Sequence, residues 1–319
     1  MTSVLTRPRS AVSPRPPFTR ALIALEALLA VAAAGGAAWL ISNPSDALPA
    51  TATARLPLPN WAWGGVLLAL GVALPAAAAA TGALAGWAWS HPAHPAVGLA
   101  LASWIVLQLA VLGFVSWLQP AMFAWGVILL VLGATHYRSW HIGWGASELE
   151  RSVPLPGDGL IPHPHFSATR AVTIDAPPQD VWPWIAQLGV GRAGWYSYDQ
   201  LDNLGWSSAR SIEPYWQSPV PGDVSSSGSD NPRTVFRVRE VRPPGVLLLE
   251  KADATWVWLL RPDAAGRTRL VTRLRARNRG PAALLTAPLL ELADFPMMRR
   301  CLLGIRERAE QAAGATVTR

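Results

Sequence analysis

The chain has 319 residues, of which 51% are hydrophobic and 15% are charged. Soluble domains carry about 25% charged residues, so a large part of this chain is predicted to lie outside water. The single cysteine, Cys301, excludes an intramolecular disulfide and a cysteine-based zinc cluster. The formal charge of +7 is distributed over both halves of the chain, so we expect no nucleic-acid partner.

Four apolar stretches come first, after a basic tail over residues 1–20 that is expected to be disordered. The predicted spans are residues 21–42, 64–87, 96–118 and 121–137. A helix needs about 20 residues to cross the hydrocarbon core, so the first three have sufficient length and the fourth is short. Proline-rich turns separate the spans, among them residues 91–95, and tryptophans lie near the span ends. The sequence therefore predicts a four-helix transmembrane region over residues 21–137.

Arginine placement predicts the orientation of this region. Four arginines precede the first span, and Arg138 and Arg151 follow the last. Because cytoplasmic loops retain positive charge, both termini of this multi-pass cell-membrane protein are expected to be cytoplasmic. The alternative is a secretory signal cleaved near residue 50, but the first apolar segment exceeds the usual signal core of about 7–15 residues.

Few features inside the spans indicate more than anchoring. Glu26 is ionisable, and we expect its carboxylate to snorkel to the interface. Pro75 predicts a kink in the second span. Small residues at Gly35, Gly36 and 76–80 suit close helix packing, and a homodimer formed through these faces is expected. A charged pathway is missing from the sequence of the spans, so transport is not predicted.

The second half has the periodicities of a globular α+β domain. A linker rich in Pro and Gly is expected over residues 138–167, the domain over 168–312 and a short tail over 313–319. Alternating or β-rich segments predict strands at residues 168–175, 234–241, 246–251, 255–261 and 268–278. Asp180 is expected to cap a short helix with Pro183 in its first turn. Asp294 and Pro296 are expected to start an amphipathic C-terminal helix of about four turns. These elements predict a curved antiparallel sheet around a long helix.

Several motifs carry a resemblance to a known superfamily. They are Ala168-Thr-Arg-Ala-Val-Thr-Ile-Asp-Ala-Pro-Pro, Val181-Trp-Pro-Trp-Ile-Ala-Gln-Leu-Gly, Gly194-Trp-Tyr-Ser-Tyr-Asp-Gln-Leu-Asp-Asn-Leu and the closing Met298-Arg-Arg-Cys-Leu-Leu-Gly-Ile-Arg-Glu-Arg-Ala-Glu. In this order they resemble the START-like helix-grip superfamily, and within it the polyketide cyclase/dehydrase-like group called SRPBCC. The resemblance covers residues 140–312 and implies a deep apolar cavity between sheet and helix. It does not define a reaction, because fold does not settle function.

Aromatic and polar residues of the domain supply the candidate ligand site. They are Trp195, Tyr196, Tyr198, Asp199, Asn203, Glu213, Trp256 and Trp258. Aromatic rings with polar tips line ligand cavities well, and a few polar groups fix the orientation of the ligand. The competing interpretation is that the rings fill the core, with Asp199 and Asn203 as local caps. Alternation alone does not decide whether Trp256 and Trp258 face the cavity or the sheet exterior.

Three other patterns favour structural interpretations. Gly189-Val-Gly191-Arg-Ala-Gly194 matches a dinucleotide fingerprint, but a helix precedes it and no βαβ unit follows, so we expect a flexible loop. His163 and His165, with His141 upstream, are expected to be linker histidines, because prolines hold the 163–165 segment extended on the surface; no metal or other cofactor is predicted. The five arginines at 237, 239, 273, 275 and 277 are expected to form a solvated or lipid-facing sheet surface.

Three functions remain open at the level of sequence. The first is a membrane-anchored cytoplasmic domain that binds a lipophilic small molecule and contacts membrane lipid. The second is a cyclase or dehydratase with Asp199 or Glu213 as acid or base, because all six histidines precede the domain. The third is a structural or regulatory membrane protein with a protein partner. The sequence does not assign catalytic residues.

Overall fold

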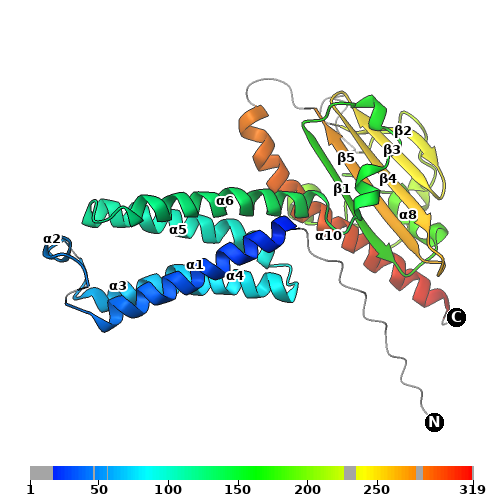
Figure 1. Ribbon diagram of the computed structural model, residues 1–319. Helices are drawn as coiled ribbons and strands as arrows, with labels where there is room; N and C mark the ends of the chain where they lie inside the picture. The colour runs from blue at the N-terminus through cyan, green and yellow to red at the C-terminus, as the bar shows by residue number, and fades with distance from the viewer. Residues whose placement is uncertain (1–16, 46, 56, 226–234, 278–282, 318–319) are drawn as a thin grey trace, which may run out of the picture. The chain divides into compact units, whose positions relative to one another are not determined.

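The computed structural model describes residues 17–45, 47–55, 57–225, 235–277 and 283–317 (Figure 1). The chain divides into two compact units, Met1–Trp140 and His141–Arg319, which are described separately. The tail that the sequence predicts to be disordered covers residues 1–20, and residues 1–16 of it lie outside the described residues. Residues 17–20 form the first turn of helix α1 (Pro17–Ser42).

The first unit contains four helices that are long and apolar enough to cross a membrane, as predicted. They are α1, the helix Trp61–Ala85, α5 (Ser90–Leu112) and α6 (Leu118–Ile142), with 23 to 26 residues each. The short helix α2 (Ala50–Thr53) lies between the first two. The fourth helix has 25 residues, so it is longer than the stretch predicted from hydrophobicity alone.

The second span is not a uniform α-helix. It consists of α3 (Trp61–Leu68), a π-helical turn η1 (Ala69–Ala73) and α4 (Leu74–Ala85). Pro75 stands at the beginning of α4, directly after the π-helical turn. The irregularity expected at this proline therefore takes the form of a π-bulge, which relieves the clash between the proline ring and the preceding turn.

The prolines at 92 and 95 do not form the turn that the sequence predicted between spans two and three. Both lie inside α5, which begins at Ser90. The turn comes earlier, at Gly86, where a left-handed backbone with φ of 75° ends α4. Pro92 fits the first helical turn because the N–H groups there have no intrahelical acceptor.

Small residues pack the helices of this unit closely. Ala76 and Ala79 of α4 are completely buried in its core, so this part of the face expected to mediate dimerisation packs within the unit. Gly98 of α5 lies against the backbone of α6 at Gly126 and Leu130, and a Cβ at Gly98 would collide with both. Backbones approach this closely only where side chains are absent.

Glu26 does not reach an interface, contrary to expectation. Its side chain is 0% exposed and is hydrogen-bonded to His94 of α5, which is equally buried. The carboxylate remains inside because a polar partner on the neighbouring helix offsets part of the cost of its dehydration.

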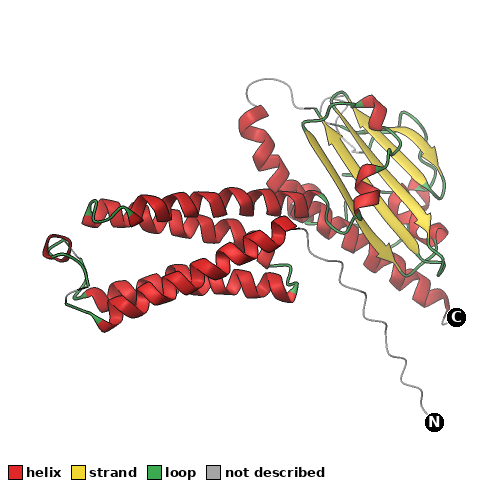
Figure 2. Cartoon of the chain, viewed as in Figure 1, coloured by secondary structure: helices red, strands yellow, loops and turns green. Residues whose placement is uncertain are grey.

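The second unit is a five-stranded antiparallel sheet, with α8 and the long helix α10 on one face and shorter helical elements on the other (Figure 2). The strand order is β1-β5-β4-β3-β2. The strands are β1 (Phe166–Ile174), β2 (Arg237–Arg242), β3 (Val246–Lys251), β4 (Ala254–Pro262) and β5 (Thr268–Ala276). The helical elements after β1 are α8 (Pro178–Ala186), α9 (Asp199–Asp202), η3 (Pro214–Trp216) and α10 (Ala283–Val317). The predicted strands are present within a few residues of their expected bounds.

Alternation along the strands sends side chains to two different cores. Trp256, Trp258 and Leu270 join the main core with α8 and α10, which includes the predicted stripe of Met298, Leu302, Ile305 and Ala309. Val257 and Val271 point to the opposite face and belong to a second core. The alternation thus places both tryptophans of β4 on the helix side of the sheet.

Two helix starts differ from the prediction. Helix α8 begins at Pro178 and Asp180 caps nothing, so Pro183 lies in the helix interior. Helix α10 begins at Ala283, and Pro296 is likewise internal. Asp294 forms an ion pair with the buried Arg170 of β1 at 2.6 Å. The Asp294 carboxylate, which the sequence predicted to lie at a helix start, is thus inside α10 and pairs with an arginine of the sheet.

The second core lies beneath residues 143–162, here called the outer strap, which crosses the sheet on the face away from α8 and α10 (Figure 2). The outer strap contains α7 (Glu148–Ser152) and η2 (Asp158–Leu160). Ser147 and Glu150 form a capping box at the start of α7. Residues 138–167, expected as a linker, thus contain the end of α6, the outer strap and the first residues of β1.

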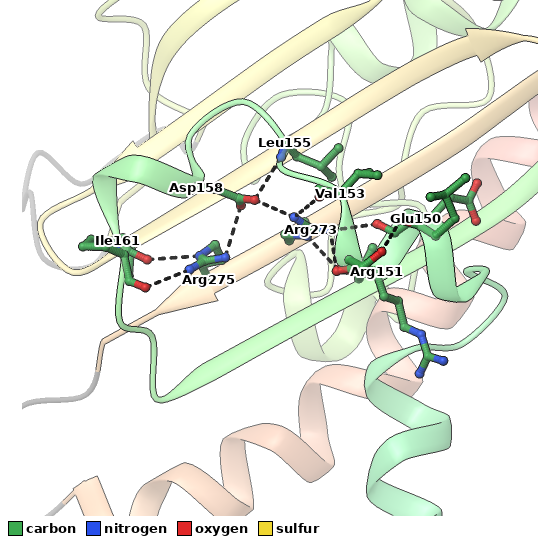
Figure 3. Close-up of polar contacts among 12 residues, drawn as sticks. Glu150, Arg151, Val153, Leu155, Asp158, Ile161, Arg273 and Arg275 are labelled. Carbon is green, nitrogen blue, oxygen red and sulfur yellow. Dashed lines mark hydrogen bonds and ion pairs between the residues drawn. The ribbon is translucent and has the colours of Figure 1, made fainter. Parts of the chain in front are cut away.

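Arginines of β5 hold the outer strap (Figure 3). Arg273 is 3% exposed and donates to Asp158 and to three strap carbonyls, those of Glu150, Arg151 and Val153. Arg275 donates to the carbonyl of Ile161 at 3.1 Å. The expectation that these two arginines face solvent or lipid was wrong, because the strap carbonyls and Asp158 compete successfully with water for their donors.

The linker histidines also divide into different environments. His141 is buried, its Nε2 lies 3.1 Å from Glu291, and its carbonyl accepts from Arg170. His141, grouped with the linker histidines, is therefore a buried residue. His163 is exposed, and His165 donates its backbone N–H to Ala276 beside the first strand pair.

Candidate functional site

Three tryptophans and a phenylalanine form a continuous stack on the helix side of the sheet, here called the aromatic stack. Trp195 lies nearly parallel to Trp256, with ring centroids 5.1 Å apart. Trp256 also contacts Trp258 at 4.9 Å and Phe236 at 5.5 Å. Trp258 is completely buried, whereas Trp195 and Phe236 are only partly buried. The stack therefore runs from the interior of the unit towards its surface.

The indole N–H groups of the stack have different partners. Trp256 donates to Thr272 at 2.8 Å, and Thr272 donates in turn to the carbonyl of Val257. The Nε1 of Trp258 is buried without a hydrogen-bond partner among the described residues. Buried donors are rarely left unpaired, because the loss of water is then not compensated. The Nε1 of Trp184, in the same core, is likewise unpaired among the described residues.

Tyr196 belongs to the core rather than to the aromatic stack. It is 2% exposed, with a left-handed backbone φ of 56°. Its hydroxyl donates to the carbonyl of Trp184 and accepts from Gln187 at 2.8 Å. Burial raises the pKa of the Tyr196 hydroxyl well above its ordinary value. The hydroxyl therefore stays protonated, and its role is to join α8 to the loop that follows.

Gln187, quoted above only within a motif, is the centre of this polar core. Its side chain is 0% exposed. Its Nε2 donates to Tyr196 and to the carbonyl of Ser211, and its Oε1 accepts from the backbone of Glu213 and from Gln217. One amide thus fixes the loop 196–217 against α8. A lone Gln carries no sequence signal for such a role.

Asp199 and Asn203 organise the same loop locally. Asp199 accepts from the backbone N–H of Ser208 at 3.0 Å and from the Ser208 hydroxyl. Asn203 is 4% exposed and donates to the carbonyl of Trp206 at 2.6 Å. Both side chains close the turn after α9, which matches the local interpretation that the sequence left open.

Glu213 and Tyr198 are exposed at the surface. Glu213 accepts from Ser211 at 3.0 Å, two residues away. Of the eight predicted site residues, the structure therefore joins Trp195, Trp256 and Trp258 in one stack. Tyr196, Asp199 and Asn203 lie in the adjoining loop, and the two candidate acid or base carboxylates both have local hydrogen bonds outside the stack.

The glycine-rich segment is a tight turn. Gly189 and Gly194 form a β-bridge, and both have positive φ values, of 138° and 79°. A Cβ at Gly194 would collide with Ser208 and Asn203, so the glycine allows the loop to close. Arg192 within the turn stacks over Trp216 at 4.7 Å, and burial lowers the pKa of its guanidinium. The segment is thus a turn that packs against neighbouring residues.

An unusual run of exposed apolar side chains follows the stack in sequence, here called the apolar loop (residues 198–220). Leu204 is 78% and Tyr215 is 83% exposed. Leu204 also has a left-handed φ of 55°, which a leucine adopts only at a cost in free energy. The other exposed apolar members are Tyr198, Leu201, Trp206, Ile212 and Val220. Scattered single apolar residues are normal on a surface, whereas here seven exposed apolar side chains lie within 23 residues of sequence.

Among the described residues, no group of three or more His, Cys, Asp or Glu side chains has a geometry that could hold a metal ion. Cys301 is buried in the main core, and burial raises the pKa of its thiol above the ordinary range. The chemistry that the site offers is therefore aromatic stacking combined with one unpaired indole donor.

The second unit is an antiparallel sheet packed against the long helix α10, and it follows four candidate membrane helices in the chain. The fold class expected from the sequence is confirmed. The chain is similar to the solution structure of the KanY protein, with 16% identity over 46% of this chain and 97% of that chain and a TM-score of 0.32. It is also similar to the polyketide cyclase-like protein Cgl2372 from Corynebacterium glutamicum, with 14% identity over 44% and 88% of the two chains and a TM-score of 0.29.

A third similar structure is the protein TTHA0849 from Thermus thermophilus, with 17% identity over 46% of this chain and 99% of that chain and a TM-score of 0.25. No protein-family model matches the chain, and no curated protein matches it.

Proposed function

We propose that the C-terminal unit binds a lipophilic small molecule at the aromatic stack, and that the four helices of the first unit anchor it to a membrane. The stacking of Trp195 on Trp256 carries this proposal. Trp195 is the partly buried end of the stack, so a flat apolar molecule can extend the stack at its ring face. Aromatic surface of this kind is the usual lining of small-molecule sites.

The unpaired donor of Trp258 defines the ligand class more closely. A hydrocarbon would leave this N–H without an acceptor, whereas a carbonyl or hydroxyl oxygen on the ligand would pair with it. The ligand is therefore a largely apolar molecule with at least one oxygen acceptor.

The apolar loop supports a contact between the domain and the bilayer. Trp206 and Tyr215 have the amphipathic rings that favour the membrane interface, and Leu201 and Leu204 add exposed hydrocarbon. Arg210, which is also exposed, can pair with anionic headgroups. A loop of this kind gives a lipophilic ligand a route from membrane to domain that avoids water.

Native mass spectrometry of the full chain in lipid nanodiscs tests the ligand. A bound lipophile is expected to be retained by the wild type, and Trp256→Ala or Trp195→Ala should weaken its binding by about tenfold, equivalent to about 1.4 kcal/mol of lost stacking. Trp39→Ala is the matched control, because this exposed tryptophan lies on α1 in the first unit. Absence of any bound lipophile, together with no binding of a panel of oxygen-bearing apolar probes, would contradict the proposal.

A cysteine scan tests the membrane contact of the apolar loop. Cys301 is the sole cysteine and is buried, so a fluorophore attached to Leu204→Cys reports on that position. Its emission should shift to the blue in nanodiscs, and lipid-borne quenchers should reduce it. Ala264→Cys in the exposed turn between β4 and β5 is the control and should remain unquenched. Equal responses at the two positions would exclude insertion of the loop.

We also propose that both ends of the chain are cytoplasmic. The arginines that flank the first and the last helix support this orientation. A fluorescent-protein fusion at the C-terminus should be bright, and an alkaline phosphatase fusion should be inactive. The reverse pattern would place the ligand-binding domain on the other side of the membrane.

A further inference from the structure

The first unit contains an ionisable cluster that anchoring does not require. The carboxylate of Glu26 lies 2.8 and 2.9 Å from the Nδ1 of His94, and both side chains are 0% exposed. Glu26 occupies the inward face of α1 between Leu22 and Leu29, two residues of the helix core. An ionisable pair at this depth costs free energy relative to apolar packing, so it indicates a function.

Two further histidines continue the cluster towards the surface. The ring of His136 of α6 lies edge-on to that of His94, with centroids 5.1 Å apart. The Nε2 of His136 lies 3.0 Å from the Nδ1 of His91, and the His91 ring stacks on Trp140 at 4.4 Å. His91 and His136 are partly exposed, unlike the pair behind them. The four side chains therefore lead from a dry interior to a wetter edge.

Close helix packing creates this arrangement. Gly133 of α6 lies directly against the backbone of α5 at His94 and Pro95, where a Cβ would not fit. His136 is one turn after Gly133, and His91 is one turn before His94, so antiparallel packing places the two side chains opposite each other. The cluster is thus fixed by backbone contact between two helices.

The other elements packed around the pair contribute few charges. The segments α3, η1 and α4 contain no ionisable residue, and Glu26 is the acidic residue of α1. Arg20 of α1 and Arg138 of α6 are exposed near the helix ends, and the ring of Tyr137 contacts Trp140. Charge compensation for the Glu26 carboxylate therefore comes from the imidazoles.

The two ring nitrogens of His94 have different surroundings, and the Nε2 is the one on the side away from Glu26. It is buried and has no hydrogen-bond partner among the described residues, whereas the Nδ1 of the same ring contacts Glu26. An imidazole can accept a proton at one nitrogen while it releases the proton on the other. His94 is therefore suited to pass a proton between His136 and Glu26.

We propose that Glu26, His94, His136 and His91 form a proton-binding site in which the two outer histidines relay a proton from water to the buried pair. A proton from water binds to His91 and crosses the hydrogen bond to His136. The His136 ring then turns to reach the Nε2 of His94, because the two rings make an edge contact without a hydrogen bond. The proton on Nδ1 then moves to the Glu26 carboxylate. The net change is the uptake of one proton and the neutralisation of one buried carboxylate, and each histidine along the path ends as the other neutral tautomer.

Infrared difference spectroscopy of the full chain in nanodiscs tests the acceptor. Acidification should produce the C=O stretch of a protonated carboxyl group in a dry environment, and Glu26→Gln should abolish this band. Gln is isosteric with Glu and can still hydrogen-bond to His94, so the variant is expected to fold, which size-exclusion chromatography checks. If Glu26→Gln does not fold, His94→Gln tests the assignment instead. Loss of the imidazole next to Glu26 should change the pH at which the band appears. The matched control is Glu291→Gln. Glu291 lies in the second unit, where its carboxylate contacts the buried His141, and its replacement should leave the band intact.

A pH jump followed in time tests the relay. His136→Phe keeps a ring at the contact with His94 but cannot carry a proton, and it should slow the appearance of the band by about tenfold or more without removing it. His163→Phe, on an exposed histidine of the second unit, should change nothing. Retention of the band in Glu26→Gln, an unchanged rate in His136→Phe, or a stoichiometric metal in the purified protein would each overturn the proposal.

Discussion

The guanidinium of Arg273 on β5 and the carboxylate of Asp158 in the outer strap form an ion pair across 115 residues of sequence. The Arg273 side chain is 4% exposed and that of Asp158 is 18% exposed. Together with the strap carbonyls that Arg273 also binds, the pair makes the segment before β1 an integral part of the second unit.

Replacement of this arginine should release the outer strap. Arg273→Ala removes the donor that Asp158 and three strap carbonyls share, with an expected loss of about 3–5 kcal/mol, although Asp158 keeps the backbone N–H of Leu155 and the ion pair with Arg275. Arg273→Lys should also be destabilising, because an ammonium cannot reproduce the planar fork. Hydrogen exchange of the strap amides in the full chain measures the effect locally. Arg239→Lys, where the side chain is 57% exposed, is the control and should remain within about 0.5 kcal/mol of the wild type.

The attachment of α7 should weaken in acid. The hydrogen bonds from Arg269 lower the pKa of Glu150 from 4.5 to about 2. Because the folded-state pKa is depressed, the carboxylate contributes its full stabilisation above about pH 4.5, and this contribution is lost as the pH falls towards 2. Protection of the α7 amides, measured relative to the intrinsic exchange rate at each pH, should fall over this window in the wild type. Glu150→Gln should remove this pH dependence, and a similar acid response in the variant would assign it to other groups.

The contact between α5 and α6 should not tolerate a methyl group. Gly98→Ala forces a Cβ into the backbone of α6 at Leu130, so we expect a loss of about 1–3 kcal/mol from overpacking. Gly35→Ala on α1 has open space around it and should be neutral or slightly stabilising, because alanine favours the helix. Thermal unfolding in one detergent compares the two variants. Equal melting temperatures would mean that the helices are less tightly packed.

Loss of the Gln187 amide should destabilise the loop that carries the candidate site. Gln187→Leu has a similar size but removes the donor to the buried Tyr196 hydroxyl and the partner of the part-buried N–H of Glu213, at about 1–3 kcal/mol in total. Near-ultraviolet circular dichroism should show altered tryptophan packing. Gln200→Leu, on an exposed residue of α9, provides the comparison and should leave the spectrum unchanged.

Much of the architecture could be predicted from periodicity. Long apolar stretches indicated the four helices, and alternation indicated the strands, because both patterns repeat along the chain with the period of the backbone. Local signals were less reliable where tertiary contacts used the same residues. Asp294 resembled a helix start but pairs with Arg170, and residues 91–95 resembled a turn but begin α5.

The candidate site was only partly predictable for the same reason. Aromatic composition identified Trp195, Trp256 and Trp258, but not that Phe236 joins them or that Tyr196 lies in the core. Residues 195 and 256 meet because the loop after α8 folds over the sheet, and no local pattern reports such a contact.

The sequence by itself determined the division into an apolar helical half and a globular α+β half, because hydrophobic periodicity depends on each residue and its near neighbours. Only the tertiary structure decided which partner each buried polar side chain binds. Arg273 faces the outer strap, and Glu26 faces His94 from 68 residues away. Dehydration of a charge is tolerated only where a specific partner compensates it, and the identity of that partner depends on which distant segments pack together.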